Sequence, residues 1–167
     1  MRHLTPDDQK KFLGQLKRHE GAKRDADGMH IAYRCTAGAL TIGYGHNLDA
    51  NPVPGIGAGS RLNDSQADRL LMADVERYAA ELGRALPWAR DLSAPRYAVL
   101  LNMAFNLGVP GLLKFKPTLE LIRRGNYGDA AARMMRTKWT YQVGDGPGGK
   151  WDRAEELAAQ MRTGEWQ

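Results

Sequence analysis

The chain has 167 residues, the usual size of one domain or of two small lobes that share a core. Hydrophobic residues make up 43% and charged residues 26%, so the composition excludes a disordered chain and a membrane-embedded one. A net charge of +5 favours a polyanionic partner, which leaves nucleic acid, an anionic membrane and an acidic cell wall as alternatives. Basic and acidic residues are mixed along the chain, and no nucleic-acid-binding motif is present.

Membrane, export and metal signals are missing from the sequence. No stretch approaches the roughly 18 apolar residues of a spanning helix, and the first residues, MRHLTPDDQKKF, lack the apolar core of a signal peptide. We therefore expect no stable membrane insertion and no export signal. Cys35 is the single cysteine, which excludes an internal disulfide and a cysteine-based zinc site. We predict no metal and no cofactor.

The first predicted helix begins after Thr5, whose side chain can cap it. Pro6 takes the first helical position, acidic residues follow in the first turn, and an apolar stripe continues at helical spacing. Gly21 is expected to end the helix. Glu20 would therefore lie at the C-terminal end of a helix.

The middle of the chain predicts a sheet and the rest predicts helices. Short extended segments between residues 31 and 48, joined by a turn at 36–38, predict a small antiparallel sheet, and residues 51–60 predict a loop rich in glycine and proline. A long amphipathic helix is expected from Asn63 to near Pro87, and Ser93 is expected to cap an apolar helix. Further helices are predicted at 118–124, 129–138 and 151–162, with a mobile loop at 141–149. This is the pattern of an α+β protein whose sheet lobe and helical lobe leave a cleft for a polymeric ligand.

Glu20 is the first candidate catalytic residue. The negative end of the helix dipole and partial burial against the sheet would both favour its protonated form, which a general acid requires at neutral pH. An ordinary exposed glutamate beside a helix-ending glycine is the alternative. Thr41 could hold a water molecule through its hydroxyl, and Gly43 and Gly45 allow the backbone to approach another segment or a ligand closely.

Several spaced motifs together resemble the phage lysozyme family, the endolysins of T-even and lambdoid phages. They are His19-Glu20-Gly21 at the end of the first helix, the hairpin that contains Tyr33, Thr41-Ile42-Gly43-Tyr44-Gly45-His46, Asn102-Met103-Ala104-Phe105-Asn106-Leu107-Gly108, Phe115 with Thr118 and Leu119, Trp139, and Arg162-Thr163-Gly164-Glu165-Trp166. The resemblance covers almost the whole chain. It implies a single lysozyme-like domain over residues 1–167, with a sheet lobe at about 20–60, a connecting helix at about 63–86, and a helical lobe formed by 87–167 and the N-terminal helix.

The resemblance also implies roles for individual residues. Glu20 matches the acid that protonates the glycosidic oxygen between N-acetylmuramic acid and N-acetylglucosamine. Thr41 matches a threonine that positions the attacking water, and His46 matches a structural histidine that closes the strand. Positions that contact the sugar or peptide parts of the substrate are matched by Asn47, Phe105, Thr118 and Arg133, and Arg153 matches a basic residue that could pair with Glu20. Phe105 and Trp139 are expected to be packing or cleft-wall residues.

The second catalytic position departs from the usual pattern. Many family members have aspartate shortly after the hairpin tyrosine, whereas this chain has Cys35, as some lambdoid endolysins do. A thiolate could act as a base if its pKa were lowered, with Arg34 as a candidate cause, whereas a buried neutral thiol would be inert. Residues 24–30 also lengthen the connection after Glu20, so Asp25 or Asp27 could supply the missing carboxylate, although Asp27-Gly28 is more typical of a solvated turn.

Three functional hypotheses remain at the level of sequence. The first is an endolysin that hydrolyses peptidoglycan with inversion, acts as a monomer, waits in the host cytoplasm for a membrane pore and lyses the host cell. The second is a lytic transglycosylase, which needs chiefly one acid and base, so Glu20 could suffice. The third is a wall-binding module without catalysis. Nucleic acid is not an expected partner.

Overall fold

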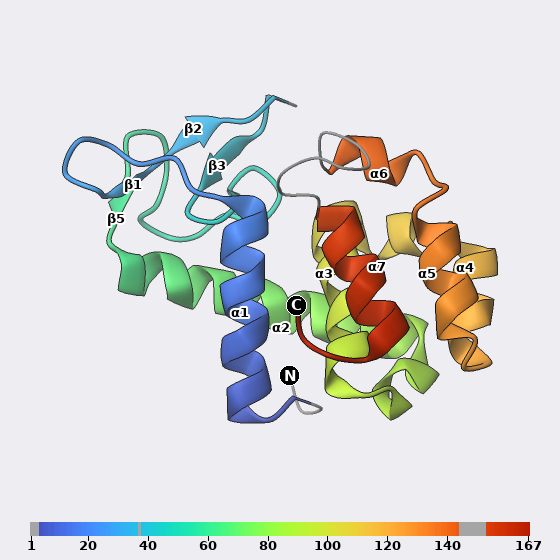
Figure 1. Ribbon diagram of the computed structural model, residues 1–167. Coiled ribbons are helices and arrows are strands. Elements are labelled where there is room, and N and C mark those ends of the chain that lie inside the picture. The colour runs from blue at the N-terminus through green and yellow to red at the C-terminus, as the bar shows by residue number, and fades with distance from the viewer. Residues whose placement is uncertain (1–3, 37, 144–152) are drawn as a thin grey trace. The chain divides into compact units, whose positions relative to one another are not determined.

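A computed structural model describes residues 4–36, 38–143 and 153–167, and Figure 1 shows their secondary structure. The strands are β1 (His30–Ile31), β2 (Tyr33–Arg34), β3 (Leu40–Ile42), β4 (His46–Asn47) and β5 (Arg61–Leu62). The helices are α1 (Pro6–Glu20), α2 (Asp64–Ala85), the 3-10 helix η1 (Pro87–Asp91), α3 (Ala94–Leu112), α4 (Lys116–Arg123), α5 (Tyr127–Met134), α6 (Trp139–Gln142) and α7 (Arg153–Thr163). The predicted α+β class is confirmed.

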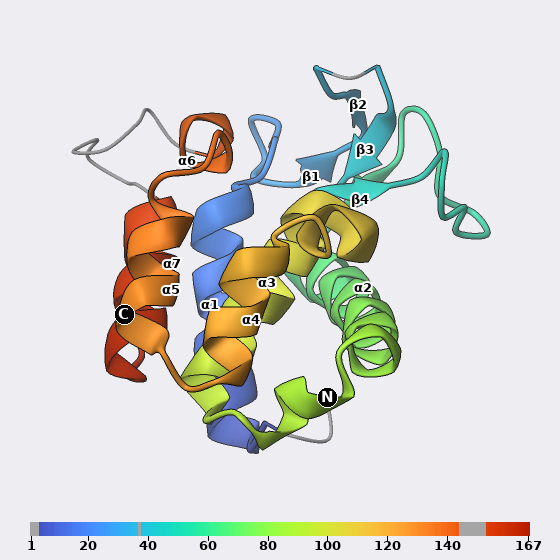
Figure 2. The same cartoon turned by 90° about the vertical axis from the view of Figure 1, so that its right-hand side faces the viewer.

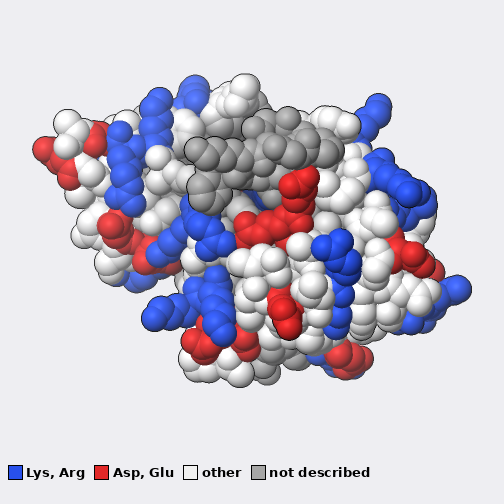
Figure 3. Space-filling model, in the orientation of Figure 1, with Lys and Arg blue, Asp and Glu red and all other residues white. Residues whose placement is uncertain are grey.

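The chain folds into two compact units. The sheet unit is Leu13–Arg77, and the helical unit consists of Met1–Phe12 together with Tyr78–Gln167. On the face shown in Figure 3, Lys and Arg side chains are interspersed with Asp and Glu, as the mixed charge pattern of the sequence predicts.

Helix α1 begins and ends as predicted. The Asp8 backbone N–H donates to Thr5 Oγ1 at 3.2 Å, and the Thr5 hydroxyl donates to Asp8 Oδ2 at 2.7 Å, so the side chain of Thr5 caps the helix. Gly21 follows the last turn with a φ of +63°, a backbone conformation that glycine adopts readily. Glu20 is therefore the last residue of α1.

The sheet unit contains two small antiparallel sheets. One has the order β2-β3-β4 and the other pairs β1 with β5. Leu40 and Ile42 of β3 pack with Leu48 and Leu62 in a buried apolar cluster, which fixes the inward face of the three-stranded sheet. Strand β5 was not predicted, because it is held by pairing with a segment about 30 residues earlier rather than by a local pattern.

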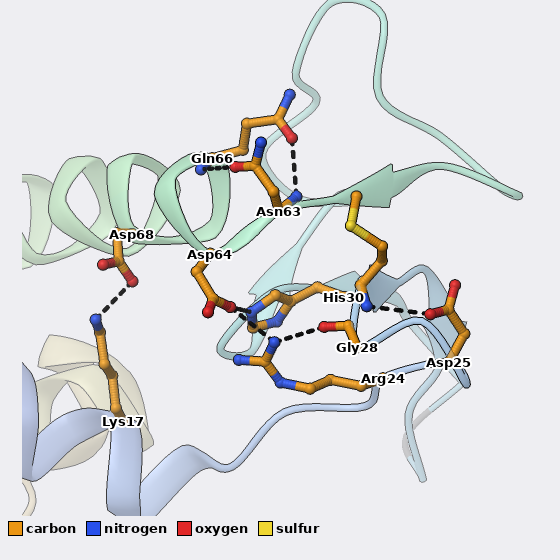
Figure 4. Close-up of polar contacts among 10 residues, drawn as sticks. Lys17, Arg24, Asp25, Gly28, His30, Asn63, Asp64, Gln66 and Asp68 are labelled. Atoms are coloured by element: carbon orange, nitrogen blue, oxygen red, sulfur yellow. Dashed lines mark hydrogen bonds and ion pairs between the residues drawn. The ribbon is translucent and has the colours of Figure 1, made fainter.

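The long helix α2 has a reciprocal cap at its N-terminus. The Gln66 N–H donates to Asn63 Oδ1 and the Asn63 N–H donates to Gln66 Oε1, both at 2.9 Å. These two bonds, drawn in Figure 4, satisfy backbone donors that no helical carbonyl reaches. The predicted start at Asn63 is confirmed, and the helix ends at Ala85, just before Pro87.

The helical unit is built around α3, whose residues 97–104 are all buried. Helix α5 packs against both α4 and α7, as Figure 2 shows, and the contacts between helices also join α7 to α3. Gly108, with a φ of +71°, and Pro110 break the regular geometry near the end of α3. Among the described residues, no single helix is long and apolar enough to span a membrane, and α3 and α4 reach that length and hydropathy only as a pair bent by 118°.

Three predictions in this unit need correction. Ser93 takes the N-cap position of α3, but its side chain makes no capping hydrogen bond, since proline in the first turn already favours the helix start. The helix predicted at 129–138 ends at Met134, and the short helices η1 and α6 were not predicted. Within the predicted loop at 141–149, Tyr141 and Gln142 belong to α6, and residues 144–149 lie outside the described residues.

Candidate active site

The Glu20 carboxylate lies against the turn between β3 and β4. A Cβ atom built on Gly45 would stand 3.4 Å from Glu20 Oε2, and Gly45 has a φ of +90°. Glycine is needed at this turn for its backbone conformation, and a Cβ atom there would be in van der Waals contact with the carboxylate. The sequence prediction that Gly45 allows a close approach of the backbone is confirmed, and the segment that approaches it is the end of α1.

One face of the three-stranded sheet carries several of the predicted site residues. Thr41 pairs with Tyr33 on one side and with Asn47 on the other, and residues directly opposite in antiparallel strands point to the same face. Because the neighbouring residues Leu40 and Ile42 point into the apolar cluster, this row faces away from it. The register thus brings Thr41 and Asn47, two residues predicted on the resemblance, into one row with Tyr33.

A single carbonyl oxygen accepts hydrogen bonds from both Cys35 and Thr41, two of the predicted catalytic residues. The Ala39 carbonyl accepts a hydrogen bond from the Cys35 backbone N–H at 2.9 Å and another from the Thr41 hydroxyl at 3.1 Å. The Gly38 N–H closes the same turn by donating to the Cys35 carbonyl at 2.8 Å. The hairpin turn therefore holds Cys35, which is half-buried, at a fixed position relative to Thr41.

Tyr33 links this face to Glu20 electrostatically. Burial raises the pKa of the Tyr33 phenol, and negative charge on Cys35 and on Glu20 raises it further. Both groups therefore lie within electrostatic range of the same hydroxyl. The Lys23 ammonium lies 5.4 Å from the centre of the Tyr33 ring and helps to hold it.

The two acidic residues of the 24–30 segment are bound to Arg61. Asp25 Oδ2 and Asp27 Oδ2 each accept from the Arg61 guanidinium at 2.6 Å, and this pairing is the main cause that lowers the pKa of Asp25. Asp25 Oδ1 also accepts from the backbone N–H groups of Asp27 and Met29, so it organises its own turn. The segment is a hydrogen-bonded turn, as predicted. Its carboxylates bind backbone N–H groups of that turn and the guanidinium of Arg61 in β5.

Further ion pairs fasten the segment to the start of α2 (Figure 4). The Arg24 guanidinium donates to the Gly28 carbonyl at 2.6 Å and pairs with Asp64 at 2.7 Å. His30, which is fully buried, contacts the same Asp64 carboxylate at 3.1 Å and packs edge-on against Tyr44. The lengthened connection after Glu20 is therefore anchored to the helix that follows the sheet.

His46 makes a buried ion pair. Its Nδ1 lies 2.7 Å from Asp74 Oδ2, and its Nε2 donates to the Asn51 carbonyl at 2.8 Å. Because a carbonyl can only accept, both ring nitrogens are hydrogen-bonded in the protonated form. Burial lowers the pKa of His46, but the Asp74 carboxylate and the Asn51 carbonyl outweigh it, so the pKa is raised. The pair of His46 with Asp74 ties β4 to α2, and Arg77 of the same helix also binds Asp74, at 2.9 Å.

The remaining predicted residues lie in the helical unit. Thr118 and Arg133 line one pocket there, whereas Phe105 packs its ring 5.4 Å from that of Tyr78. Arg153 is buried, and its Nε donates to Asn102 Oδ1 at 2.9 Å. The pairing of Arg153 with Glu20 stays a prediction, as do the substrate contacts of Phe105, Thr118 and Arg133.

The sequence model of the phage lysozyme family matches residues 17–156, which include Glu20, Cys35, Thr41 and the two predicted residues of the pocket. The chain belongs to the phage lysozyme family. It is 28% identical to an endolysin of Acyrthosiphon pisum secondary endosymbiont phage 1 over 78% of this chain and 77% of the relative. It is also 28% identical to probable T4-type lysozyme 2 of Dictyostelium discoideum, over 77% of this chain and 84% of that protein. The protein is therefore a lysozyme, an enzyme that lyses the bacterial cell wall by acting on peptidoglycan.

Reasoning from the sequence missed some features of this lysozyme. The contact of Gly45 with Glu20 joins positions 25 residues apart, and only the paired glycines around Tyr44 signalled a close approach. Lys114 and Lys138 line the pocket that holds Thr118 and Arg133, but they come from separate parts of the chain and carry no motif. Trp139 is buried, as expected of a packing residue, and its indole N–H donates to Asn106 at 3.1 Å.

Proposed function

We propose that this lysozyme hydrolyses the β-1,4 bond between N-acetylmuramic acid and N-acetylglucosamine, with Glu20 as the acid that protonates the glycosidic oxygen. The observation that carries the proposal is the position of the Glu20 carboxylate against Gly45, in a sheet unit where Tyr33 and the buried Thr41 share the sheet face that points away from the apolar cluster. A general acid must be held still and must reach the leaving oxygen. The turn at Gly45 helps to hold the carboxylate still, and because glycine has no side chain it does not cover the carboxylate.

Thr41 supports the delivery of water in this proposal. Its hydroxyl proton is already given to the Ala39 carbonyl, so the oxygen can only accept a further hydrogen bond. A water molecule that donates one proton to Thr41 keeps a lone pair for attack on the sugar. In an inverting hydrolase this attack comes from the face opposite the leaving group, and a base removes the second proton.

We assign to Cys35 the acceptance of that second proton. Its backbone N–H and the Thr41 hydroxyl bind the same Ala39 carbonyl, which supports this assignment. A thiolate is a competent base, whereas a neutral thiol is a poor one. The proposal therefore assigns Glu20, Thr41 and Cys35 to catalysis, and Asn47, Phe105, Thr118 and Arg133 to substrate binding.

A lytic transglycosylase is the second candidate, and one observation favours it. Cys35 stands where many family members have a carboxylate, while Asp25 and Asp27 are already bound to Arg61. With Glu20 as the only catalytic carboxyl group, the muramic acid hydroxyl could attack in place of water and give an anhydro sugar. Analysis of the released sugars separates the two reactions. Reducing ends support hydrolysis, anhydro ends overturn it, and a protein that binds walls without clearing them overturns both.

The biological setting forms part of the same proposal. We propose that the enzyme accumulates in the cytoplasm of a bacterial host, reaches the wall through a membrane pore and then lyses the cell. The relative from the Acyrthosiphon pisum endosymbiont phage carries the name endolysin, which supports this setting. Expression in a bacterium with and without a pore-forming partner tests it, because lysis should require the pore. Lysis without any pore would contradict the proposed route.

A further inference from the structure

The turn between β3 and β4, residues 43–45, lies against the first turns of α2. A Cβ atom built on Gly43 would stand 3.7 Å from the Cβ of Ala67. Asp64 and Asp68 precede and follow Ala67 by three positions and by one, so Asp64 shares its side of the helix with Ala67 and with Asp68. The contact with the turn is therefore accompanied by two carboxylates of α2.

Both aspartates hold side chains that come from other segments of the sheet unit (Figure 4). Asp64 pairs with the Arg24 guanidinium at 2.7 Å and lies 3.1 Å from Nε2 of His30. Asp68 pairs with the Lys17 ammonium of α1 at 2.6 Å. The Arg24 guanidinium, and after it His30, hold the pKa of Asp64 below its usual range, so Asp64 is negatively charged at neutral pH. Helix α2 thus anchors one side chain from α1 and two from the connection that follows α1.

These three side chains meet around Tyr44, which is buried. The His30 ring packs edge-on against the tyrosine ring with the ring centres 4.8 Å apart, and Lys17 Nζ lies 5.3 Å from the centre of the tyrosine ring. Asp64 raises the pKa of the Arg24 guanidinium and the Tyr44 phenol raises it further, so the phenol lies near Arg24 as well. Tyr44 is therefore held both at its ring and at its hydroxyl.

Tyr44 is the only residue of the turn with a side chain, because glycine stands on both sides of it. Gly43 and Gly45 have φ values of +67° and +90°, which glycine adopts readily. Gly45 is exposed, and it is the residue that lies against the Glu20 carboxylate. The position of Gly45 beside the acid thus depends on the backbone of the turn and on the one side chain that anchors it.

We propose that Tyr44 is a positioning residue for Glu20. The side chains anchored on α2 hold the tyrosine, and the tyrosine keeps Gly45 beside the carboxylate. This inference rests on the proposed function, in which Glu20 donates the proton. It also gives the lengthened connection after α1 a role, because Arg24 and His30 belong to that segment. Displacement of the acid lowers the rate of the chemical step and leaves substrate affinity largely intact.

Steady-state rates on soluble, uncrosslinked glycan strands of peptidoglycan test the role of Tyr44. Tyr44→Leu removes the ring, and we expect kcat to fall about tenfold while KM stays unchanged. Tyr44→Phe keeps the ring contacts and should retain at least about half of the wild-type kcat. Thermal unfolding of each variant is measured as well, and the rates are compared well below the lowest unfolding transition. A tyrosine that only stabilised the fold would leave kcat unchanged under these conditions.

The two aspartates of α2 provide a second variant that leaves the buried ring in place. Asp64 is exposed and Asp68 is half-buried, so the double variant Asp64→Asn/Asp68→Asn should fold, and its kcat should fall about threefold. The matched control is Asp7→Asn. Asp7 forms a similar pair with Lys11 at 2.8 Å in the helical unit, and its loss should leave kcat unchanged.

The contact between the turn and the acid can be followed without turnover. The amide NMR signal of Gly45 should shift with pH as the neighbouring Glu20 carboxyl group gains and loses its proton, and this part of the shift should be missing in Glu20→Gln. Tyr44→Leu should reduce the part that depends on Glu20 by at least about half, because the field of a charge weakens with distance. Tyr44→Phe should keep it.

The two readouts together decide the proposal. A reduced Gly45 shift and a low kcat in Tyr44→Leu, with both retained in Tyr44→Phe, support it. An unchanged Gly45 shift in Tyr44→Leu overturns it, and so does a wild-type kcat in a variant that has lost the shift. If Tyr44→Leu does not fold, the double aspartate variant decides by the same readouts. If Glu20→Gln is as active as the wild type, the proposed function fails, while the Gly45 signal still decides whether Tyr44 holds the turn.

Discussion

Gly45 and the carboxylate of Glu20 are packed so closely that a single methyl group would fill the gap between them. The Cβ of an alanine at position 45 would lie 3.4 Å from Glu20 Oε2, which is van der Waals contact. The turn between β3 and β4 thus limits the positions that the side chain of Glu20, the last residue of α1, can adopt. Proton transfer in a fixed geometry requires an acid that is held in this way.

Replacement of Gly45 by alanine tests this contact. Two effects are expected, backbone strain of about 1–3 kcal/mol at a φ of +90° and a methyl group in van der Waals contact with the Glu20 carboxylate, which restricts the space around the acid. Gly59 is the matched control, since its φ is +84° but no atom beyond its chain neighbours lies within 4 Å of the Cβ that alanine would add. Denaturant unfolding should show a loss of stability in both variants, whereas wall clearance should fall only in Gly45→Ala. Equal activity losses in the two variants would show that the contact with Glu20 is unimportant.

The role of Cys35 is tested by alanine and aspartate. If the thiol supplies the base, Cys35→Ala should lose about 100-fold in the rate of peptidoglycan solubilisation, and Cys35→Asp should stay active. The fold of each variant is checked by its thermal unfolding. Full activity of the alanine variant would remove Cys35 from catalysis, and its products should then carry anhydro ends.

Asp25 and Asp27 are expected to act on stability alone. Asp27→Asn should keep wild-type wall clearance, because the carboxylate is exposed and bound to Arg61. The lowered pKa of Asp25 means that its ion pair stabilises the fold above the ordinary value of 3.8 and that this contribution is lost as the pH falls through the lowered value. Unfolding of Asp25→Asn and wild type at several acidic pH values should show their difference shrinking towards low pH. A large activity loss in Asp27→Asn with intact fold would make it a catalytic carboxylate.

His46 should make the stability of the sheet unit depend on pH in the opposite direction. Its pKa is raised above the ordinary 6.5, so its pair with Asp74 contributes fully below that value and is weakened as the pH rises through the raised value. The difference in unfolding free energy between wild type and His46→Gln should therefore be largest near about pH 6 and smaller near about pH 9. Asp74→Asn should lower the free energy of unfolding by about 3 kcal/mol, because it removes the buried carboxylate that pairs with both His46 and Arg77. If the difference in unfolding free energy between wild type and His46→Gln instead grows towards alkaline pH, the assignment of a charged pair is contradicted.

Local signals in the sequence were enough to predict the helices that frame the site. Thr5 and Asn63 cap their helices through bonds to residues three positions away, so both starts could be seen in the sequence itself. The strands were harder, because β1 and β5 have two residues each and exist through the pairing of His30 with Leu62. No window of the sequence contains both partners of that pair.

The candidate site was predictable as a set of residues but not as a geometry. Family motifs pointed to Glu20, Cys35 and Thr41, and the register of β2-β3-β4 explains how Thr41 meets Tyr33 and Asn47. The link of Cys35 and Thr41 through one carbonyl and the binding of Asp25 to Arg61 depend on how the turns close in three dimensions. Side-chain partners more than 30 residues apart leave no periodic signal.

The most direct test of the account is the rate of peptidoglycan solubilisation by Glu20→Gln beside that of the wild type. Glutamine keeps the shape of the side chain beside Gly45 and removes the proton that a general acid donates, so the account predicts a loss of at least about 100-fold with unchanged thermal unfolding. Retention of wild-type wall clearance by a folded Glu20→Gln variant would contradict the central claim that Glu20 is the catalytic acid.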